Sequence, residues 1–238
     1  MSNDIDTRIS PTLHPARLKH VVGDDNATAG VLTSTETALR GAYEALRAIH
    51  NAREAAKTNP AWTEGQQIIA TADFADNQRE RVSKALDAAR GELVTGADDL
   101  ERELAAPITS KAAATISTEI RAHVKGLKGQ ARIDFIRKAI VGGDDVTATA
   151  VLGTVPFLSG VDPKMHAAFT RMYHEHNAPG KAARLKAMRG AVDVIDDNWS
   201  VFLLNELEKA VGAPWGKVSA LRAAKTKAEE AFILKQPG

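Results

Sequence analysis

Two long runs of apolar and small residues, repeating at alternating steps of three and four, constrain the fold of this chain most strongly. The first extends from Leu32 to Ala56 and the second from Ala72 to Leu100. A repeat with this spacing lines one face of an α-helix, as in a coiled coil. Asn59-Pro60 separates the runs, because the residue before a proline disfavours helical backbone. The runs therefore predict an antiparallel helical hairpin over residues 31–106.

The second helix of this hairpin is expected to be the longer one. An unbroken helix from Trp62 to Leu104 would span roughly 65 Å, against roughly 39 Å for the first. Leu93, Leu100 and Leu104 would then lie beyond the first helix, so the N-terminal arm, the rest of the chain or another subunit must cover them. These leucines are candidate interface residues. The alternative is a break at Thr95-Gly96, with Asp98 capping a new helix.

The rest of the chain also reads as helix. Hydrophobic residues make up 44% of its 238 residues but aromatic residues only 5%, which favours close-packed helices over sheets. We expect an all-α protein in which the long, coiled-coil-like hairpin precedes a compact multi-helix bundle. The expected segments are a partly extended N-terminal arm (1–30), the hairpin (31–106), the bundle (107–212) and a C-terminal helix (213–238).

Helices within these segments follow from apolar spacing and from proline and glycine positions. Ile108, Ala112, Ile116, Ile120 and Val124 recur every fourth residue, which predicts a helix that starts at Pro107. Further helices are predicted over 130–141, after Asp162-Pro163, up to Gly212, and over 215–234.

The carboxylate pair in Gly143-Asp144-Asp145 has two interpretations. Clustered carboxylates can bind a hard cation or act as acid and base. At a helix start, however, they satisfy free backbone N–H groups and the positive end of the dipole. The same Gly-Asp-Asp stands 120 residues earlier, again before Val-Leu, which favours the capping role. The expected helix-start residues are Asp24, Asp25, Asp144, Asp145 and Asp162.

No catalytic, metal or cofactor signature is supported by spacing. His174 and His176 lie two residues apart and so face nearly opposite sides of a helix, while His166 and Glu175 do not complete a known ligand pattern. Asp193, Asp196 and Asp197 are expected on a solvated helix face. The chain lacks cysteine, and it has no phosphate-binding loop, dinucleotide fingerprint or nucleophile elbow. We predict no enzyme activity, no cofactor and no metal.

Positive charge gathers in the middle of the chain. Residues 111–190 carry 13 Lys and Arg against 6 Asp and Glu, whereas residues 1–110 carry 12 against 17. This distribution leaves open a nucleic-acid-associated protein that uses the basic segment 121–189. The alternative is that these charges cover ordinary helix faces or pair with the acidic half. The candidate contacts are Lys125, Lys128, Arg132, Arg137 and Lys138.

An apolar run, Val155 to Val161, joins two helices where a polar loop is expected. Either this loop folds back into the core, or Phe157 and Leu158 form a docking knob for another protein. These two residues complete the set of candidate interface residues.

The segment from Ile133 to Tyr173 resembles small all-helical proteins encoded by phages and prophages of Gram-negative bacteria, most without assigned function. The resemblance rests on Ala139-Ile140, Gly143-Asp144-Asp145, Ala150-Val151-Leu152-Gly153 and Pro156-Phe157-Leu158-Ser159-Gly160-Val161-Asp162. It implies a phage virion or assembly component and supplies no catalytic residue.

Together these patterns predict a non-enzymatic structural or assembly protein, whose partners are other protein subunits in a homo-oligomer or larger assembly. Nucleic acid is the second partner considered. The polar, acidic N-terminus shows no secretory signal and no run is long enough to span a membrane, so we expect a protein made in the cytoplasm, with the virion as a further location.

Overall fold

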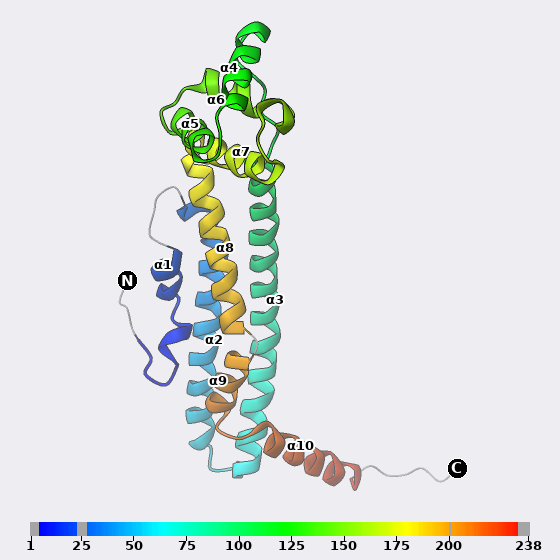
Figure 1. Cartoon of the computed structure of the whole chain (residues 1–238). Helices are drawn as coiled ribbons and strands as arrows, with labels where there is room; N and C mark the ends of the chain where they lie inside the picture. The colour runs from blue at the N-terminus through cyan, green and yellow to red at the C-terminus, as the bar shows by residue number, and fades with distance from the viewer. Residues whose placement is uncertain (1–4, 23–27, 200, 233–238) are drawn as a thin grey trace, which may run out of the picture. The chain divides into compact units, whose positions relative to one another are not determined.

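The computed structural model describes residues 5–22, 28–199 and 201–232 of the chain. These residues are almost entirely helical and contain no strand, which confirms the all-α class (Figure 1). The α-helices are α1 (Ala16–Val22), α2 (Thr33–Lys57), α3 (Glu64–Leu104), α4 (Ala114–Gly126), α5 (Gln130–Val141), α6 (Asp145–Leu152), α7 (Pro163–Asn177), α8 (Pro179–Trp199), α9 (Val201–Val211) and α10 (Trp215–Glu230). Short 3-10 helices occupy Pro11–Leu13, Ala29–Val31 and Pro156–Ser159. Among the described residues, none of the helices combines the length and apolar character of a membrane span.

The chain forms two compact units. Unit 1 comprises Met1–Val94 and Arg189–Gly238, and unit 2 comprises Thr95–Met188. The boundaries fall inside α3 and α8, whereas the segments expected from the sequence divide the chain at residues 30, 106 and 212. Each unit is described separately below.

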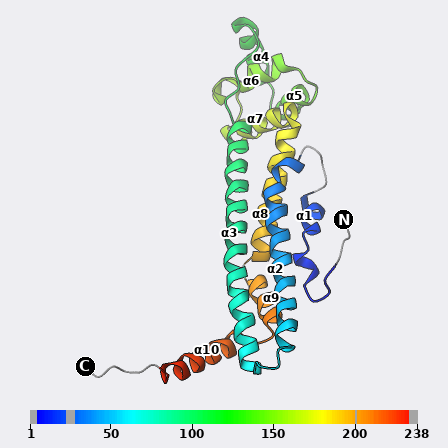
Figure 2. The ribbon, with the colours of Figure 1, turned by 180° about the vertical axis from the view of Figure 1, so that it is seen from behind.

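The helical hairpin of unit 1 follows the predicted seams. Figures 1 and 2 show α2 beside α3 from opposite sides, joined by a short turn that contains Pro60. Nearly every predicted seam position on α2 is buried, with Leu46 and Ile49 at 1% and 0% exposure. On α3, Ala72 and Ala75 are fully buried and Val82, Leu86, Ala89 and Leu93 are at most 5% exposed. The buried positions of both helices therefore follow the predicted spacing.

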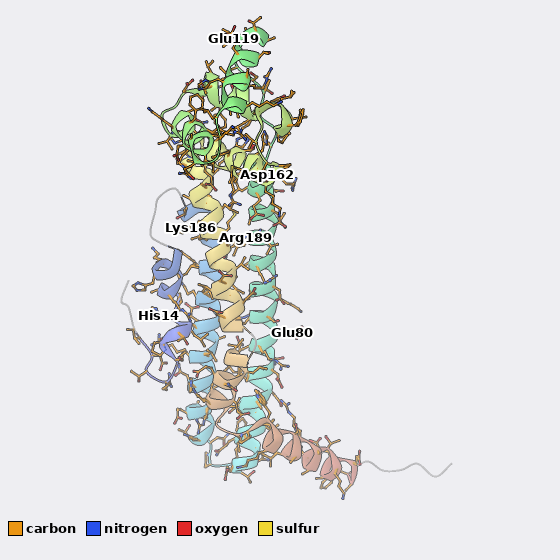
Figure 3. All side chains as sticks on the ribbon, in the orientation of Figure 1. His14, Glu80, Glu119, Asp162, Lys186 and Arg189 are labelled. Carbon is orange, nitrogen blue, oxygen red and sulfur yellow. The ribbon has the colours of Figure 1, made fainter. Side chains whose placement is uncertain are left out.

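The N-terminal arm of unit 1 packs on α2 and α9 through both apolar and polar contacts. Ile9 and Leu18 are at most 3% exposed. The backbone N–H of Asp6 donates to the Tyr43 hydroxyl at 2.8 Å, and that of Ser10 donates to the buried Glu206 carboxylate at 3.1 Å. The ring of His14, labelled in Figure 3, meets the ring of Tyr43 edge-on at 5.2 Å. Residues 6–14 of the arm are therefore held against α2 and α9 by specific contacts.

The C-terminal part of unit 1 follows the prediction except near its end. The helix expected to end at Gly212 is represented by α8 and α9, which end at Trp199 and Val211; residue 200, between them, lies outside the described residues. The last helix, α10, ends at Glu230 instead of Leu234. Val218 is buried, but Ala228 is exposed and Phe232 is 88% exposed, so the buried face of α10 is confined to its first turns.

The core of unit 2 is built from branched and aromatic side chains. Val124, Ile136, Ile140, Val151 and Phe169, from α4 to α7, are at most 5% exposed and lie in one cluster. α5 has the predicted bounds, and α7 begins at the predicted Asp162-Pro163, with the Asp162 carboxylate accepting from the N–H groups of Lys164 and Met165. Figure 3 labels Asp162 at this helix start. On α7, His176 is exposed, whereas Tyr173 is buried.

The prediction that a helix starts at Pro107 is wrong for the first seven residues. Residues 107–113 are not helical, and α4 begins only at Ala114. The segment instead bonds to α6: the N–H of Lys111 donates to the Thr149 hydroxyl at 2.9 Å. The backbone of Ile108 and Ser110 lies so close to Gly153 that a Cβ there would come within 2.7–3.0 Å of it. Ile116, expected inward, is 49% exposed.

The second long helix, α3, is continuous over its 41 residues, about 61 Å. The alternative break at Thr95-Gly96 does not occur. Within unit 2, Gly96 allows a close packing contact, because a Cβ at this position would lie 2.9 Å from the Met188 methyl carbon. The glycine therefore serves helix packing and not helix termination.

Candidate interaction surface

The leucines proposed as interface residues are covered by the chain itself. Leu93 and Leu104 are 3% and 2% exposed, and Leu100 is half-buried. In unit 2, Leu100 and Leu104 pack with Leu185 and Met188 of α8. The sequence left open whether the N-terminal arm, the rest of the chain or another subunit covers Leu100 and Leu104. The structure shows that the rest of the chain covers them. Leu93 and Leu104 are thus already buried within the chain, and only Leu100 keeps an exposed part.

The apolar loop between α6 and α7 exposes three large apolar side chains within residues 155–158. Val155, Phe157 and Leu158 are 61%, 75% and 44% exposed. Sequence analysis missed Val155, although it belongs to the same apolar run. The expectation that the loop folds back into the core holds only for its end, since Ser159 and Val161 are buried. We call Val155, Phe157 and Leu158 the apolar knob.

The backbone beneath the apolar knob is tied to its surroundings. The Ser159 hydroxyl donates to the Val151 carbonyl at 3.3 Å, and Gly160 takes a left-handed conformation with φ of 64°. A left-handed turn of this kind favours glycine, because a Cβ would be strained there. The Arg132 guanidinium donates to the Gly160 carbonyl. The exposure of Phe157 therefore results from a fixed turn.

Arg132 is a structural residue and not a free cation. It donates to the Val124 carbonyl at 3.1 Å, to the Lys125 carbonyl at 3.0 Å, and to the carbonyls of Leu127 and Gly160. One side chain thus donates to carbonyls at the C-terminal end of α4, of which that of Val124 also accepts from the Leu127 N–H at 3.2 Å, and it ties this helix end to the loop before α7. Four hydrogen bonds from this guanidinium, which the sequence offered as a nucleic-acid contact, thus go to carbonyls of the protein itself.

The other basic candidates are exposed. Lys125 places its Nζ over the Phe157 ring, 4.8 Å from the centroid, as in a cation–π contact. The Arg137 guanidinium lies 3.7 Å from the carboxylate of Asp134, three residues earlier on α5. Lys128 and Lys138 are exposed and make no ion pair with any residue in the described part of the chain. The structure joins Lys125 to the apolar knob, a pairing that residue spacing does not reveal.

Asp144 and Asp145 have different roles. The Asp144 carboxylate accepts from the Thr147 N–H at 3.0 Å, as predicted for an N-cap. The Asp145 carboxylate instead bonds the Lys111 ammonium and accepts from the Tyr173 hydroxyl at 3.1 Å. The hydrogen bond from Lys111, followed by that from Tyr173, lowers the pKa of Asp145 below its ordinary value. Burial, followed by the Asp145 contact, raises the pKa of Tyr173. Asp24 and Asp25 lie outside the described residues.

An apolar groove of about 450 Å³ lies beside the knob in unit 2. Its walls include Ile108, Leu152, Val155, Pro156 and His166. The His166 Nε2 atom is buried and has no hydrogen-bond partner among the described residues. His174 contacts the Ala106 carbonyl through its Nε2 at 2.8 Å, which joins α7 to the segment after α3. The described residues contain no group of three or more His, Asp or Glu side chains arranged to hold a metal ion.

Comparison with known proteins adds no relative: no protein-family model, curated protein or solved structure matches this chain significantly.

Proposed function

We propose that this chain is a non-enzymatic structural or assembly protein, which packs its helices and its apolar knob against other protein subunits. The main observation behind this proposal is the exposure of Phe157. A large aromatic side chain in a fixed, exposed turn gains free energy when a partner covers it, and such residues dominate the binding energy of protein interfaces. Val155 and Leu158 extend the apolar area around it.

The acidic residues considered for chemistry support the same proposal. Asp144 and Asp162 cap helices, and Asp145 bonds Lys111 and Tyr173. Each carboxylate thus has a structural partner that accounts for its position. The resemblance of residues 133–173 to phage-encoded helical proteins, which includes the knob itself, extends the proposal to a component of a phage virion or of its assembly.

Sedimentation velocity over a range of protein concentrations tests this function. We expect the wild-type chain to form larger assemblies as its concentration rises, and the double variant F157S/L158S to weaken that association at least tenfold. V141S is the matched control. Val141 is 57% exposed at the C-terminal end of α5 and is not part of the apolar knob, so its replacement should leave the association unchanged. Equal association of wild type and F157S/L158S would refute the role of the knob.

Nucleic-acid association is the second candidate function. It is favoured by the exposed Lys125, Lys128 and Lys138 and by the position of Lys125 over an exposed aromatic ring, because stacking on a ring beside positive charge is typical of single-strand binding. Fluorescence anisotropy with single-stranded and duplex DNA across a salt series tests it. Binding that weakens steeply with salt and is lost in K125E/K128E would support it, whereas no binding at low salt would exclude it.

A further inference from the structure

A second surface, in unit 1, has the features of a self-association site. A groove of about 500 Å³ runs between α2 and α3, which Figure 2 shows side by side. Small residues form most of its walls: Thr37 and Gly41 on α2, and Ala85, Ala88 and Ala89 on α3. Because these side chains are short, another helix can approach the backbones of α2 and α3 closely.

The α3 wall of this groove is a second heptad-like seam. Arg81, Ala85, Ala88 and Glu92 all line the groove and follow one another at steps of four, three and four. This spacing places them on one face of the helix. All four are exposed, whereas the first seam, which includes Val82, Leu86 and Leu93, is buried. The described chain therefore covers one seam of α3 and leaves the other open.

The two charged residues of this second seam are unpaired. Neither Arg81 nor Glu92 makes an ion pair or side-chain hydrogen bond with any residue that the structure describes. Other charges on α3 do have partners: Lys84 bonds Glu80 at 2.6 Å and Arg90 bonds Asp196 at 2.7 Å. Within the described residues, the groove thus ends in one free positive charge and one free negative charge, separated by alanines.

The order of these residues is self-complementary. Arg81 and Glu92 lie equally far from the midpoint between Leu86 and Asp87, and so do Ala85 and Ala88. A second α3 running antiparallel about that midpoint places Arg81 opposite Glu92 at both ends and Ala85 opposite Ala88 in the centre. A two-fold interface requires this kind of pairing, in which each surface contacts its own counterpart.

We propose that two copies of this chain associate through this groove, with the α3 helix of each copy lying antiparallel in the α2–α3 groove of the other. The alanines provide the close contact at the axis, and the Arg81–Glu92 pairs at the two ends fix register and direction. The surface uses no residue of the apolar knob. The dimer therefore goes beyond the proposed function and stands or falls separately.

Charge reversal provides the test, because the pairing is reciprocal. R81E alone sets two carboxylates against each other at both ends, and E92R alone sets two guanidinium groups against each other. Each single variant should weaken the dimer at least tenfold in sedimentation equilibrium. An equimolar mixture of the two variants should form a heterodimer of near wild-type affinity, since both ends then pair opposite charges. The double variant R81E/E92R should form a homodimer for the same reason.

Two controls separate this dimer from other effects. K225E, on the exposed face of α10, changes the net charge as R81E does and should leave the dimer unchanged. Circular dichroism checks that the variants are folded. F157S/L158S should retain the dimer and lose only the larger assemblies. Dimers of undiminished affinity in both R81E and E92R, a mixture no stronger than either variant alone, or a wild-type chain that stays monomeric at high concentration would each overturn the proposal.

Discussion

Units 1 and 2 are both helical, yet they are stabilised in different ways. Unit 1 packs long helices along alanine-rich seams, in which Ala72 and Ala75 are fully buried. Unit 2 packs short helices around larger side chains such as Ile136 and Phe169, and joins them by side-chain hydrogen bonds to backbone carbonyls. A long helix repeats the same contact many times, so loss of one matters less. A short helix depends on a few specific contacts, of which Arg132 makes four.

Replacement of Arg132 should therefore have the largest effect and should distinguish the units. R132A removes one donor from each of four carbonyls, at the end of α4 and at Gly160, and we expect it to lower the free energy of unfolding by about 3 kcal/mol. R132K should rescue little, because a single ammonium cannot reach four carbonyls. Chemical unfolding measures the loss, and hydrogen exchange should locate it in residues 114–163.

R137A is the matched control for Arg132, since its exposed pair with Asp134 should contribute less than about 0.5 kcal/mol. If R132A and R137A unfolded with similar midpoints, the structural role assigned to Arg132 would be wrong.

Acid should act on unit 1 through the N-terminal arm. The Arg8 hydrogen bond lowers the pKa of Asp6 from 3.8 to about 2, and the Asp6 side chain is 7% exposed. A carboxyl with a lowered pKa stabilises the fold above its ordinary pKa and loses that contribution as the pH falls toward its folded value. Between pH 3.8 and 2 we expect a loss of about 1–2 kcal/mol.

Urea unfolding of wild type and D6N at pH 5 and pH 2.5 measures this contribution. D6N should be less stable at pH 5, and the difference between the two proteins should shrink at pH 2.5. If the difference in stability between wild type and D6N stayed the same at both pH values, protonation of Asp6 would not be the cause of the acid destabilisation.

Helix caps should give the smallest effects, and they lie in unit 2. D144A and D162A each remove the acceptor of a helix-start N–H group, which should cost about 1 kcal/mol. D162N should restore most of the loss, because asparagine also caps well. Thermal unfolding measures both changes. A D162A protein as stable as wild type would show that Pro163 alone is enough to start α7.

The sequence predicts the hairpin of unit 1 well, because the information is local. Steps of three and four identify the buried face of α2 and α3, and Pro60 identifies the turn. The capping roles of Asp144 and Asp162 are equally local, since each carboxylate bonds a backbone group two or three residues later.

The errors occur where distant residues decide the structure. The spacing of Ile108, Ala112 and Ile116 suits a helix, but the Thr149 hydroxyl and the backbone near Gly153 hold this segment in another form. Leu104 looks uncovered until Leu185 is placed against it. The position of Lys125 over Phe157 likewise joins residues 32 positions apart, so the sequence assigned these two residues to separate candidate sites.

The division of the chain into units also bears on how it folds during synthesis. Unit 2 is a continuous segment, Thr95–Met188, and all of its residues have been made before the ribosome reaches Arg189. Unit 1 needs both ends of the chain, since Ser10 and Glu206, which bond each other, are separated by 196 residues. Because domains fold as units during translation, the unit in the middle is completed first. The paired seams of α2 and α3 must wait for α9, and during that interval their apolar face is open to the solvent.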